Sequence, residues 1–283
     1  MKFPGAVVCG LVAALAGIFI FSTAREENSP APAARYLGFD RNEYPGDEAL
    51  AILRKTFSFS GYWLGAPPGG KQSSWRGKRE LLEKNGFGFL VLFNARETRS
   101  IKNAADGAEA GNLDAQSATA SAKQEGFPQN TVIYLDIEEG GRLPDSYHAY
   151  LSAWFDELIR HGFRPGVYCS GMPVNEGHGV SITTAQDIQS HALGKSISYW
   201  IYNDACPPSL GCSFQESQLS LAQSGFPAAT VWQYAQSPRR KEFTAKCQSH
   251  YADDGNCYAA NDTGRKWFLD LNVSSSPNPS APR

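Results

Sequence analysis

Short apolar runs with the composition of β-strands recur along most of this 283-residue chain, and they constrain its fold more than any other feature. Each run is four to eight residues long, is rich in β-branched and aromatic residues, and is bounded by Gly, Pro, Asn or Asp, as strands are. We expect eight strands, at Tyr36–Asp40, Phe59–Leu64, Gly88–Ala95, Thr131–Glu138, Pro165–Ser170, Ser198–Asp204, Thr230–Ala235 and Trp267–Asn272.

Helical patterns separate the early strands. Residues Ser73–Asn85 end at Gly86, and Asp145–His161 open with an acidic residue and close at Gly162. Alternation of strand and helix favours a parallel sheet, and eight strands in one domain favour closure into an α/β barrel, a (β/α)8 fold of the TIM type. Such barrels carry their active sites at the rim where the strands end. The segments after Ala95, Ser170, Asp204 and Ala235 are long, and we interpret them as rim loops.

The two ends of the chain differ in composition from the barrel, which we place at residues 36–273. Lys2 precedes an apolar run from Val7 to Phe21, and small residues at 22–24 follow, which predicts a signal peptide over residues 1–24. The alternative is an uncleaved membrane anchor, for which the run is short. We expect residues 25–35 to be a linker and residues 274–283, rich in Ser and Pro, to be a disordered tail.

Charge and cysteine spacing narrow the partners. A formal charge of −2 provides no excess of cations for phosphates, so nucleic acid is not an expected partner. Export permits disulfides, and among the several possible connectivities the close spacings favour Cys206–Cys212 and Cys247–Cys257 bridges, with Cys169 as a buried thiol. Zinc sites favour CxxC-type spacing or neighbouring histidines, and the chain has neither. We therefore expect no metal and no cofactor.

Four carboxylates follow or lie within predicted strands. Asp136 and Glu138 end a hydrophobic strand, and alternation puts them on one face with Cα atoms roughly 6.5 Å apart. Crowded carboxylates raise each other's proton affinity, so that one of them can serve as a general acid near neutral pH. Asp40 and Asp270 occupy similar positions in the first and last strands. If all strands are parallel and the barrel closes, those two strands are neighbours, and the four acids converge on one rim.

These landmarks resemble those of a known family. Gly38-Phe39-Asp40, Leu135-Asp136-Ile137-Glu138, Trp232-Gln233-Tyr234 and Leu269-Asp270-Leu271-Asn272 occur in the order found in glycoside hydrolase family 25 lysozymes. The chain is even more similar to bacterial secreted domains, formerly of unknown function, that are described as glycoside-hydrolase-like. It departs from the lysozymes directly after Asp40, where Arg41-Asn42-Glu43 follows.

The resemblance implies an irregular barrel with few helices between its last three strands, acting on an N-acetylated glycan such as peptidoglycan. Glu138 would be the proton donor, and Asp136 would orient an acetamido group whose carbonyl attacks the anomeric carbon. Asp40 and Asp270 would bind sugar hydroxyls. Flat aromatic rings stack on sugar faces, and we expect Tyr62, Trp232 and Tyr234 to line the groove.

Three functions remain open at this point. The first is a secreted, periplasmic or envelope glycoside hydrolase, and the second is a catalytically inactive barrel that only binds glycan. The third is a purely structural envelope domain. A membrane is a partner only if the N-terminal segment stays uncleaved.

Overall fold

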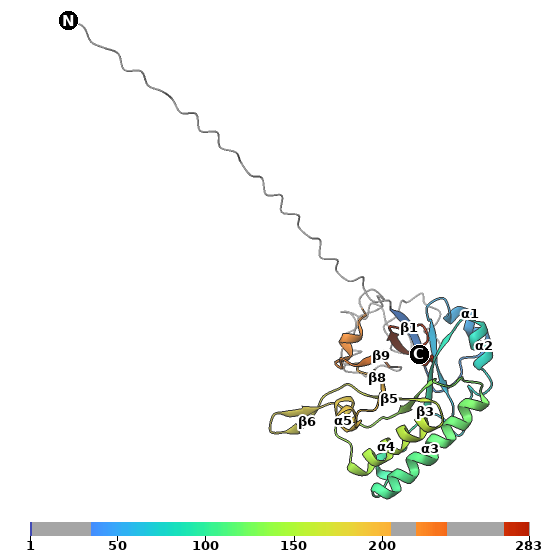
Figure 1. The fold of residues 1–283 in the computed structure, drawn as a ribbon. Helices are drawn as coiled ribbons and strands as arrows, with labels where there is room; N and C mark the ends of the chain where they lie inside the picture. Colours follow the sequence, from blue (N-terminus) through green and yellow to red (C-terminus); the bar gives the residue numbers. More distant parts are fainter. Residues whose placement is uncertain (2–34, 205–218, 237–268, 283) are drawn as a thin grey trace. The chain divides into compact units, whose positions relative to one another are not determined.

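A closed barrel of eight strands forms the body of the protein (Figure 1). The computed structural model describes residues 1, 35–204, 219–236 and 269–282. Around the barrel the strand order is β1-β10-β9-β8-β5-β4-β3-β2. The strands are β1 Tyr36–Asp40, β2 Phe59–Trp63, β3 Gly88–Asn94, β4 Val132–Asp136, β5 Arg164–Ser170, β8 Ser198–Tyr202, β9 Ala229–Ala235 and β10 Asp270–Ser274.

The predicted α/β barrel is confirmed, and seven of its strands begin within one residue of their expected starts. Strands such as β2 and β4 are buried at every position, because a barrel covers one face with helices and fills the other with side chains. That double burial is the reason why their sequences are continuously apolar. The last strand begins at Asp270, three residues later than expected.

The direction of β10 corrects one premise of the sequence analysis. β10 runs antiparallel to both of its neighbours, β1 and β9, whereas the other pairs in the barrel are parallel. Side chains alternate identically in either direction along a strand, so the pattern alone could not reveal this. Asp40 at the end of β1 is paired with Asp270 at the beginning of β10. The reversal therefore keeps Asp270 at the rim where the parallel strands end.

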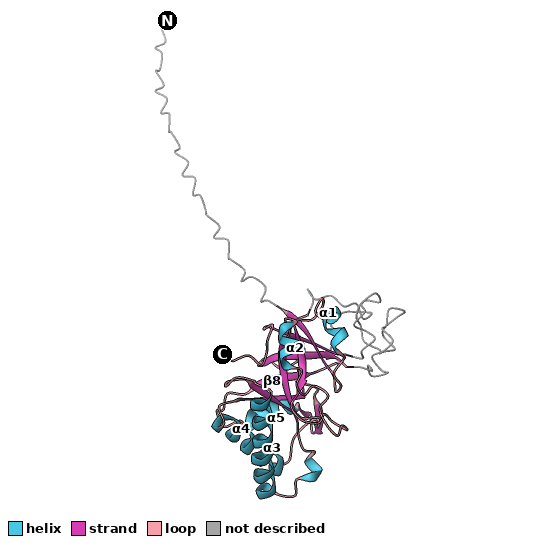
Figure 2. Ribbon diagram, turned by 90° about the vertical axis from the view of Figure 1, so that its right-hand side faces the viewer, coloured by secondary structure: helices cyan, strands magenta, loops and turns pink. Residues whose placement is uncertain are grey.

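Helices cover the early half of the barrel, as Figures 1 and 2 show for α3 and α4, which lie side by side. The predicted helix at 145–161 is confirmed as α4, which ends where Gly162 adopts a φ of 81°. Only six residues of the other predicted helix are helical, in α2. The helices are α1 Leu50–Leu53, α2 Arg79–Lys84, α3 Ala104–Gln124, α4 Asp145–Arg160 and α5 Thr184–His191, with 3-10 turns at Asp47–Ala49, Thr98–Ser100 and Leu221–Ser224.

Two segments that we interpreted as rim loops contain regular structure. The segment after Ala95 holds the 21-residue helix α3, whose first turn is capped by the Asn103 side chain. The segment after Ser170 forms a hairpin of β6 (Val174–Gly177) and β7 (Val180–Ile182) before α5 begins. In Figure 1 this hairpin projects away from the barrel.

The segment after β10 is ordered, which corrects the expectation of a disordered tail over 274–283. Ser280 lies between the first residues of β3 and β4: its amide donates to Phe89 O at 2.9 Å, and its carbonyl accepts from Val132 N at 3.0 Å. Its hydroxyl accepts from Val91 N at 2.9 Å, and the Asn278 side chain accepts from Phe89 N. These bonds satisfy backbone groups that would otherwise be buried without partners, so the segment closes the barrel at the end opposite the rim acids.

Cys169 is a free, buried thiol in β5, as predicted. The predicted signal peptide and most of the linker, at 2–34, lie outside the described residues. So do both predicted disulfides, at 205–218 and 237–268. Within the described part of the chain, no helix combines the length and apolarity needed to cross a membrane.

Candidate functional site

The four acids expected at the rim line one cavity of about 170 Å³. Asp40 ends β1, Asp136 ends β4, Glu138 follows two residues later and Asp270 begins β10. The other lining residues are Asn42, Trp63, Pro68, Leu92, Tyr168, Trp200, Gln233 and Gln236. Residues more than 200 positions apart in the sequence thus meet in one space, because the first and last strands of the barrel are neighbours.

Two side-chain amides hold Asp40 in place. Its Oδ2 accepts hydrogen bonds from Asn272 Nδ2 at 2.7 Å and from Gln233 Nε2 at 3.0 Å. Burial raises the pKa of Asp40 from 3.8 to about 7, although these two bonds oppose the shift and the charge of Glu138 adds to it. Asp40 therefore gains and loses a proton near neutral pH.

The two amides are themselves oriented by aromatic donors. Trp200 Nε1 donates to Asn272 Oδ1 at 2.8 Å, and Tyr168 OH donates to Gln233 Oε1 at 2.8 Å. An indole nitrogen can only donate, so the oxygen of Asn272 must face Trp200 and its NH₂ group must face Asp40. Asp40, the two amides and the two aromatic donors thus form one hydrogen-bond network beside the cavity.

The pKa values of Asp136 and Glu138 are both raised, and each carboxyl group affects the other. Burial raises the pKa of Asp136 well above its ordinary value, and the negative charges of Glu138 and Asp40 raise it further. Burial also raises the pKa of Glu138, as does the charge of Glu139, while a hydrogen bond from Asp136 opposes the shift. Asp136 Oδ2 is buried and has no hydrogen-bond partner. The pair can hold a proton at pH values where an exposed carboxylic acid would have lost it.

A second cavity of about 180 Å³ adjoins the first. The two have Pro68, Asp136 and Glu138 in common, and the second is lined in addition by Gly69, Asn94, Ala95, Arg96, Glu97 and Glu139. Glu138 therefore borders two adjacent spaces, which is the arrangement needed by an acid that protonates a bond between two linked units.

The three aromatic residues expected in the groove lie elsewhere, which corrects that prediction. Tyr62 is fully buried, donates to the Glu125 carboxylate and packs edge-on against Phe127. Trp232 and Tyr234 are also buried, and Trp232 Nε1 donates to Asn203 O at 3.2 Å. None of the three lines the cavity with the acids.

The correction has a simple geometric cause. Neighbouring residues of a strand point to opposite faces, and the cavity receives Trp63 next to Tyr62, and Gln233 between Trp232 and Tyr234. Both faces of these strands are buried, so polarity does not distinguish the inside of the barrel from the outside. Sequence reasoning also assigned no role to Asn272 or Gln233, although both stand within the quoted motifs. Their polarity inside apolar strands was the available signal.

Comparison with known proteins supplies the family. A family model described as "Rv2525c-like, glycoside hydrolase-like domain" matches residues 71–244, well over half of the chain. This match includes Asp136 and Glu138. No curated protein has significant sequence similarity to the chain.

Several solved structures share the fold. An uncharacterized B. stearothermophilus protein is 19% identical with a TM-score of 0.55, over 84% of this chain and 95% of that one. The Mycobacterium tuberculosis Tat-secreted protein Rv2525c, in complex with L-tartrate, is 14% identical with a TM-score of 0.50, over 85% and 94%. GHIP, a glycosyl hydrolase 25 of Streptococcus pneumoniae, is 14% identical with a TM-score of 0.51, over 87% and 89%. At these identities the likeness establishes the fold alone.

Proposed function

Because the chain belongs to the family of Rv2525c-like, glycoside hydrolase-like domains, we propose that it is an exported glycoside hydrolase of N-acetylated cell-wall polysaccharide, such as peptidoglycan. The observation that carries this proposal is the convergence of Asp40, Asp136, Glu138 and Asp270 on one cavity. Asp40 and Asp136 are buried, and burial of carboxylates destabilises a fold, so their gathering with Glu138 and Asp270 points to a purpose beyond stability. Hydrolysis of a glycosidic bond requires such acids.

Glu138 acts as the general acid in this proposal. It donates its proton to the oxygen of the glycosidic bond as that bond to the anomeric carbon breaks, and the raised pKa keeps the proton available. Because Glu138 borders both cavities, the sugars on the two sides of the bond occupy one cavity each. The deprotonated Glu138 then accepts a proton from the water that completes hydrolysis.

Asp136 orients the acetamido group of the substrate. Asp136 lines the cavity, and its carboxylate accepts the acetamido N–H, which directs the carbonyl oxygen of that group at the anomeric carbon. A hydrogen bond to a carboxylate favours its charged form, so binding of substrate lowers the proton affinity of Asp136. The shared proton is thereby transferred toward Glu138, where it is needed.

The remaining lining residues bind the sugar. Asp40 and Asp270 accept hydrogen bonds from hydroxyl groups, and Asn42 adds an amide. Trp63 and Tyr168 take the role of stacking platforms that we had expected of Tyr62, Trp232 and Tyr234, because they line the cavity.

The decisive experiment compares the wild type with Glu138→Gln on purified peptidoglycan, with released muropeptides identified by mass spectrometry. Loss of one general acid costs about 10² to 10⁴-fold in rate, so product from the variant should fall near background. Glu80→Gln, the same isosteric change at an exposed position of α2, should retain wild-type activity. Equal product from wild type and Glu138→Gln would refute the assignment of the acid.

A catalytically inactive glycan-binding barrel is the alternative. It is favoured by one observation: Asp136 is buried next to Glu138, and burial and like charges raise the pKa of Asp136, so that it competes for the proton that a general acid needs. Calorimetry that detects oligosaccharide binding without any product, unchanged in Glu138→Gln, would select this alternative. Absence of both binding and turnover would leave a structural envelope domain.

Export is the remaining part of the proposal. We assign residues 1–24 to a cleaved signal peptide and 25–35 to a linker, which places the barrel outside the cytoplasm. Cys206–Cys212 and Cys247–Cys257 disulfides fit that compartment. The relative Rv2525c is itself described as Tat-secreted. Mass spectrometry of the mature protein tests both points, because an intact N-terminus or free thiols at these four positions would contradict them.

A further inference from the structure

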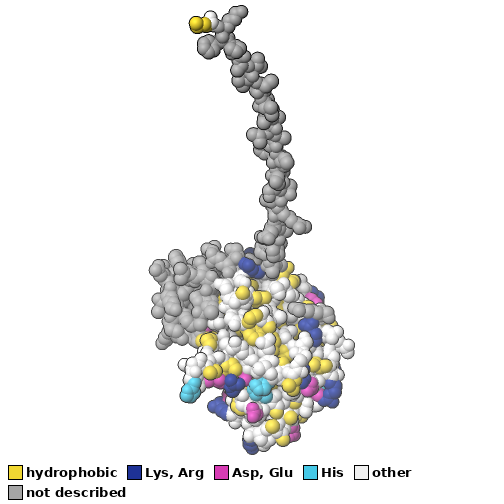
Figure 3. Space-filling model, turned by 60° about the vertical axis from the view of Figure 1, so that its left-hand side comes forward, with side chains coloured by type: hydrophobic (Ala, Val, Ile, Leu, Met, Phe, Trp, Pro, Cys, Tyr) yellow, Lys and Arg dark blue, Asp and Glu magenta, His cyan; other side chains and the backbone are white. Residues whose placement is uncertain are grey.

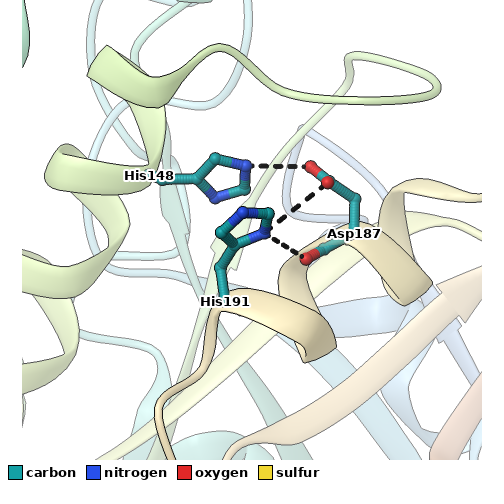
Figure 4. Close-up of side chains that lie close together, drawn as sticks. All are labelled: His148, Asp187 and His191. Atoms are coloured by element: carbon teal, nitrogen blue, oxygen red, sulfur yellow. Dashed lines mark hydrogen bonds and ion pairs between the residues drawn. The ribbon is translucent and has the colours of Figure 1, made fainter.

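Two histidines and an aspartate from helices α4 and α5 meet in one cluster (Figure 4), and none of them lines the acid-lined cavity. His148 comes from α4, and Asp187 and His191 lie one turn apart on α5. One potential ligand atom from each lies within 4.8 Å of the other two. No motif in the sequence marks this group, because residues of two separate helices form it.

The distances suit a metal ion. His148 Nε2 lies 3.0 Å from Asp187 Oδ2, and His191 Nδ1 lies 3.6 Å from Asp187 Oδ1. Two ligands bound about 2.1 Å from a tetrahedral zinc ion are separated by about 3.4 Å, which falls between these values. The imidazole rings stack with centroids 3.7 Å apart, and the His191 side chain is 44% exposed. His191 Nδ1 here donates to Asp187 O at 2.8 Å, so the His191 ring would have to turn for one of its nitrogens to face the same ion as a nitrogen of His148.

The burial of His148 is the second observation. Only 11% of its side chain is exposed; Nε2 is paired with Asp187 without hydrogen-bond geometry, and Nδ1 has no hydrogen-bond partner. A buried polar atom without a partner is destabilising, and a metal ion would give His148 one. Asp187 is fully buried, and its carboxylate can provide the negative charge that a bound cation needs.

One positive charge stands near the group. Arg142 Nη1 lies 3.5 Å from Asp187 Oδ1, but the same guanidinium makes two hydrogen bonds of 2.9 Å to Glu176 on β6. Glu176 thus offsets the charge of Arg142. On the face drawn in Figure 3, histidines lie at the surface among side chains of both signs.

We propose that His148, Asp187 and His191 bind one divalent transition-metal ion, with zinc as the best match. Two imidazole nitrogens and one carboxylate oxygen are ligands that zinc prefers, and three protein ligands leave a fourth position for water. None of the three residues lines the acid-lined cavity, so this site is separate from the proposed glycan chemistry and does not depend on it.

The site would stiffen the loop that carries Glu138. Asp187 Oδ2 accepts the Leu143 amide at 2.8 Å, and Thr184 Oγ1, on the same helix, donates to Glu139 O at 3.0 Å. Both bonds fasten residues 137–144, between β4 and α4, to α5. A metal ion bound by His148 of α4 and by Asp187 and His191 of α5 would add a third link, between the two helices.

The test uses the full-length protein after treatment with a chelator, with zinc chloride as the only ligand. Calorimetry and thermal unfolding are measured for the wild type, His148→Ala, His191→Ala and a control, His178→Ala, which removes an exposed histidine from the hairpin turn. We expect saturable zinc binding and a zinc-dependent rise in Tm in the wild type and control. Both cluster variants should bind more than ~10-fold more weakly, since even residues that merely support metal ligands contribute that much.

Other groups that bind zinc, cysteines included, are present in all four proteins. The difference in zinc affinity between the cluster variants and the control therefore reports the contribution of the cluster alone. Circular dichroism establishes that each variant is folded, and His191→Ala, at a half-exposed position, guards against a failure of His148→Ala to fold. Cobalt provides an independent readout, because its visible spectrum reports ligand number in the wild type. Absence of saturable binding, or wild-type affinity in either folded cluster variant, would overturn the proposal.

Discussion

Replacing Asp40 by Asn should remove a pH-dependent loss of stability. The pKa of Asp40 is raised from 3.8 to about 7, so the folded protein holds this proton more tightly than the unfolded chain does. A raised pKa in the folded state contributes stability that is present below pH 4 and is lost as pH rises through about 7. The difference between a pKa of 3.8 and one of about 7 corresponds to a free energy on the order of 4 kcal/mol.

The measurement is urea unfolding, followed by tryptophan fluorescence, of wild type and Asp40→Asn at several pH values between 4 and 8.5. The variant minus wild-type difference in unfolding free energy should increase by up to about 4 kcal/mol across this range, whatever its value at pH 4. Comparing differences cancels the cost of the substitution itself. Asp156→Asn, at an exposed position of α4, should give a flat difference. A flat difference for Asp40→Asn as well would refute the inferred burial of charge.

Three further changes test other parts of the site and fold. Glu139→Gln removes a charge that raises the pKa of Glu138, so the high-pH limb of glycan hydrolysis should shift to lower pH in a pH–rate profile; an unchanged limb would contradict this coupling. Deleting residues 275–283 removes four hydrogen bonds to β3 and β4 and should lower the unfolding free energy by about 4 kcal/mol, at about 1 kcal/mol each, in urea titrations; unaltered stability would mean that the segment does not brace the barrel. Trp63→Ala should weaken oligosaccharide binding at least several-fold by calorimetry, whereas Tyr62→Phe should leave it unchanged, and the opposite ranking would restore the original assignment of Tyr62.

The barrel and the acid cluster could be predicted because each rests on a strong local signal. Strands buried on both faces are continuous apolar runs, and a carboxylate at the end of such a run is conspicuous. β4, with Asp136 at its end, is the clearest case. Closure of the sheet then dictates that acids on distant strands share a rim.

Helix α3 was missed because it lacks a large hydrophobic stripe. It packs on α4 through small residues: a Cβ added at Gly107 would lie 2.2 Å from Ser146 O, and one at Gly111 would lie 2.3 Å from Tyr150 O. These two glycines are the residues that let the two helices approach closely. A pattern of small residues spaced four apart carries this information, but hydrophobic periodicity does not.

The orientation of aromatic residues and the grouping of histidines were beyond the sequence for a different reason. Whether Tyr62 or Trp63 faces the cavity depends on the phase of a strand with two buried faces. Whether His148 meets His191 depends on the crossing of α4 and α5. Both depend on tertiary packing, and tertiary packing produces no periodic pattern in a single sequence.

The pairing of β1 with β10 has a consequence for how the cavity comes into being. Asp40 is held by Asn272, 232 positions further along the chain, and the same two strands close the barrel. A nascent chain that has not yet reached residue 272 can form helices and local strand pairs, but it lacks the partner that fixes this carboxylate. The pocket is consequently assembled only after residue 272 has been made, and contacts across so long a loop form slowly. Whatever the chain does at that rim, it cannot begin before strand β10 has been made and has paired with β1.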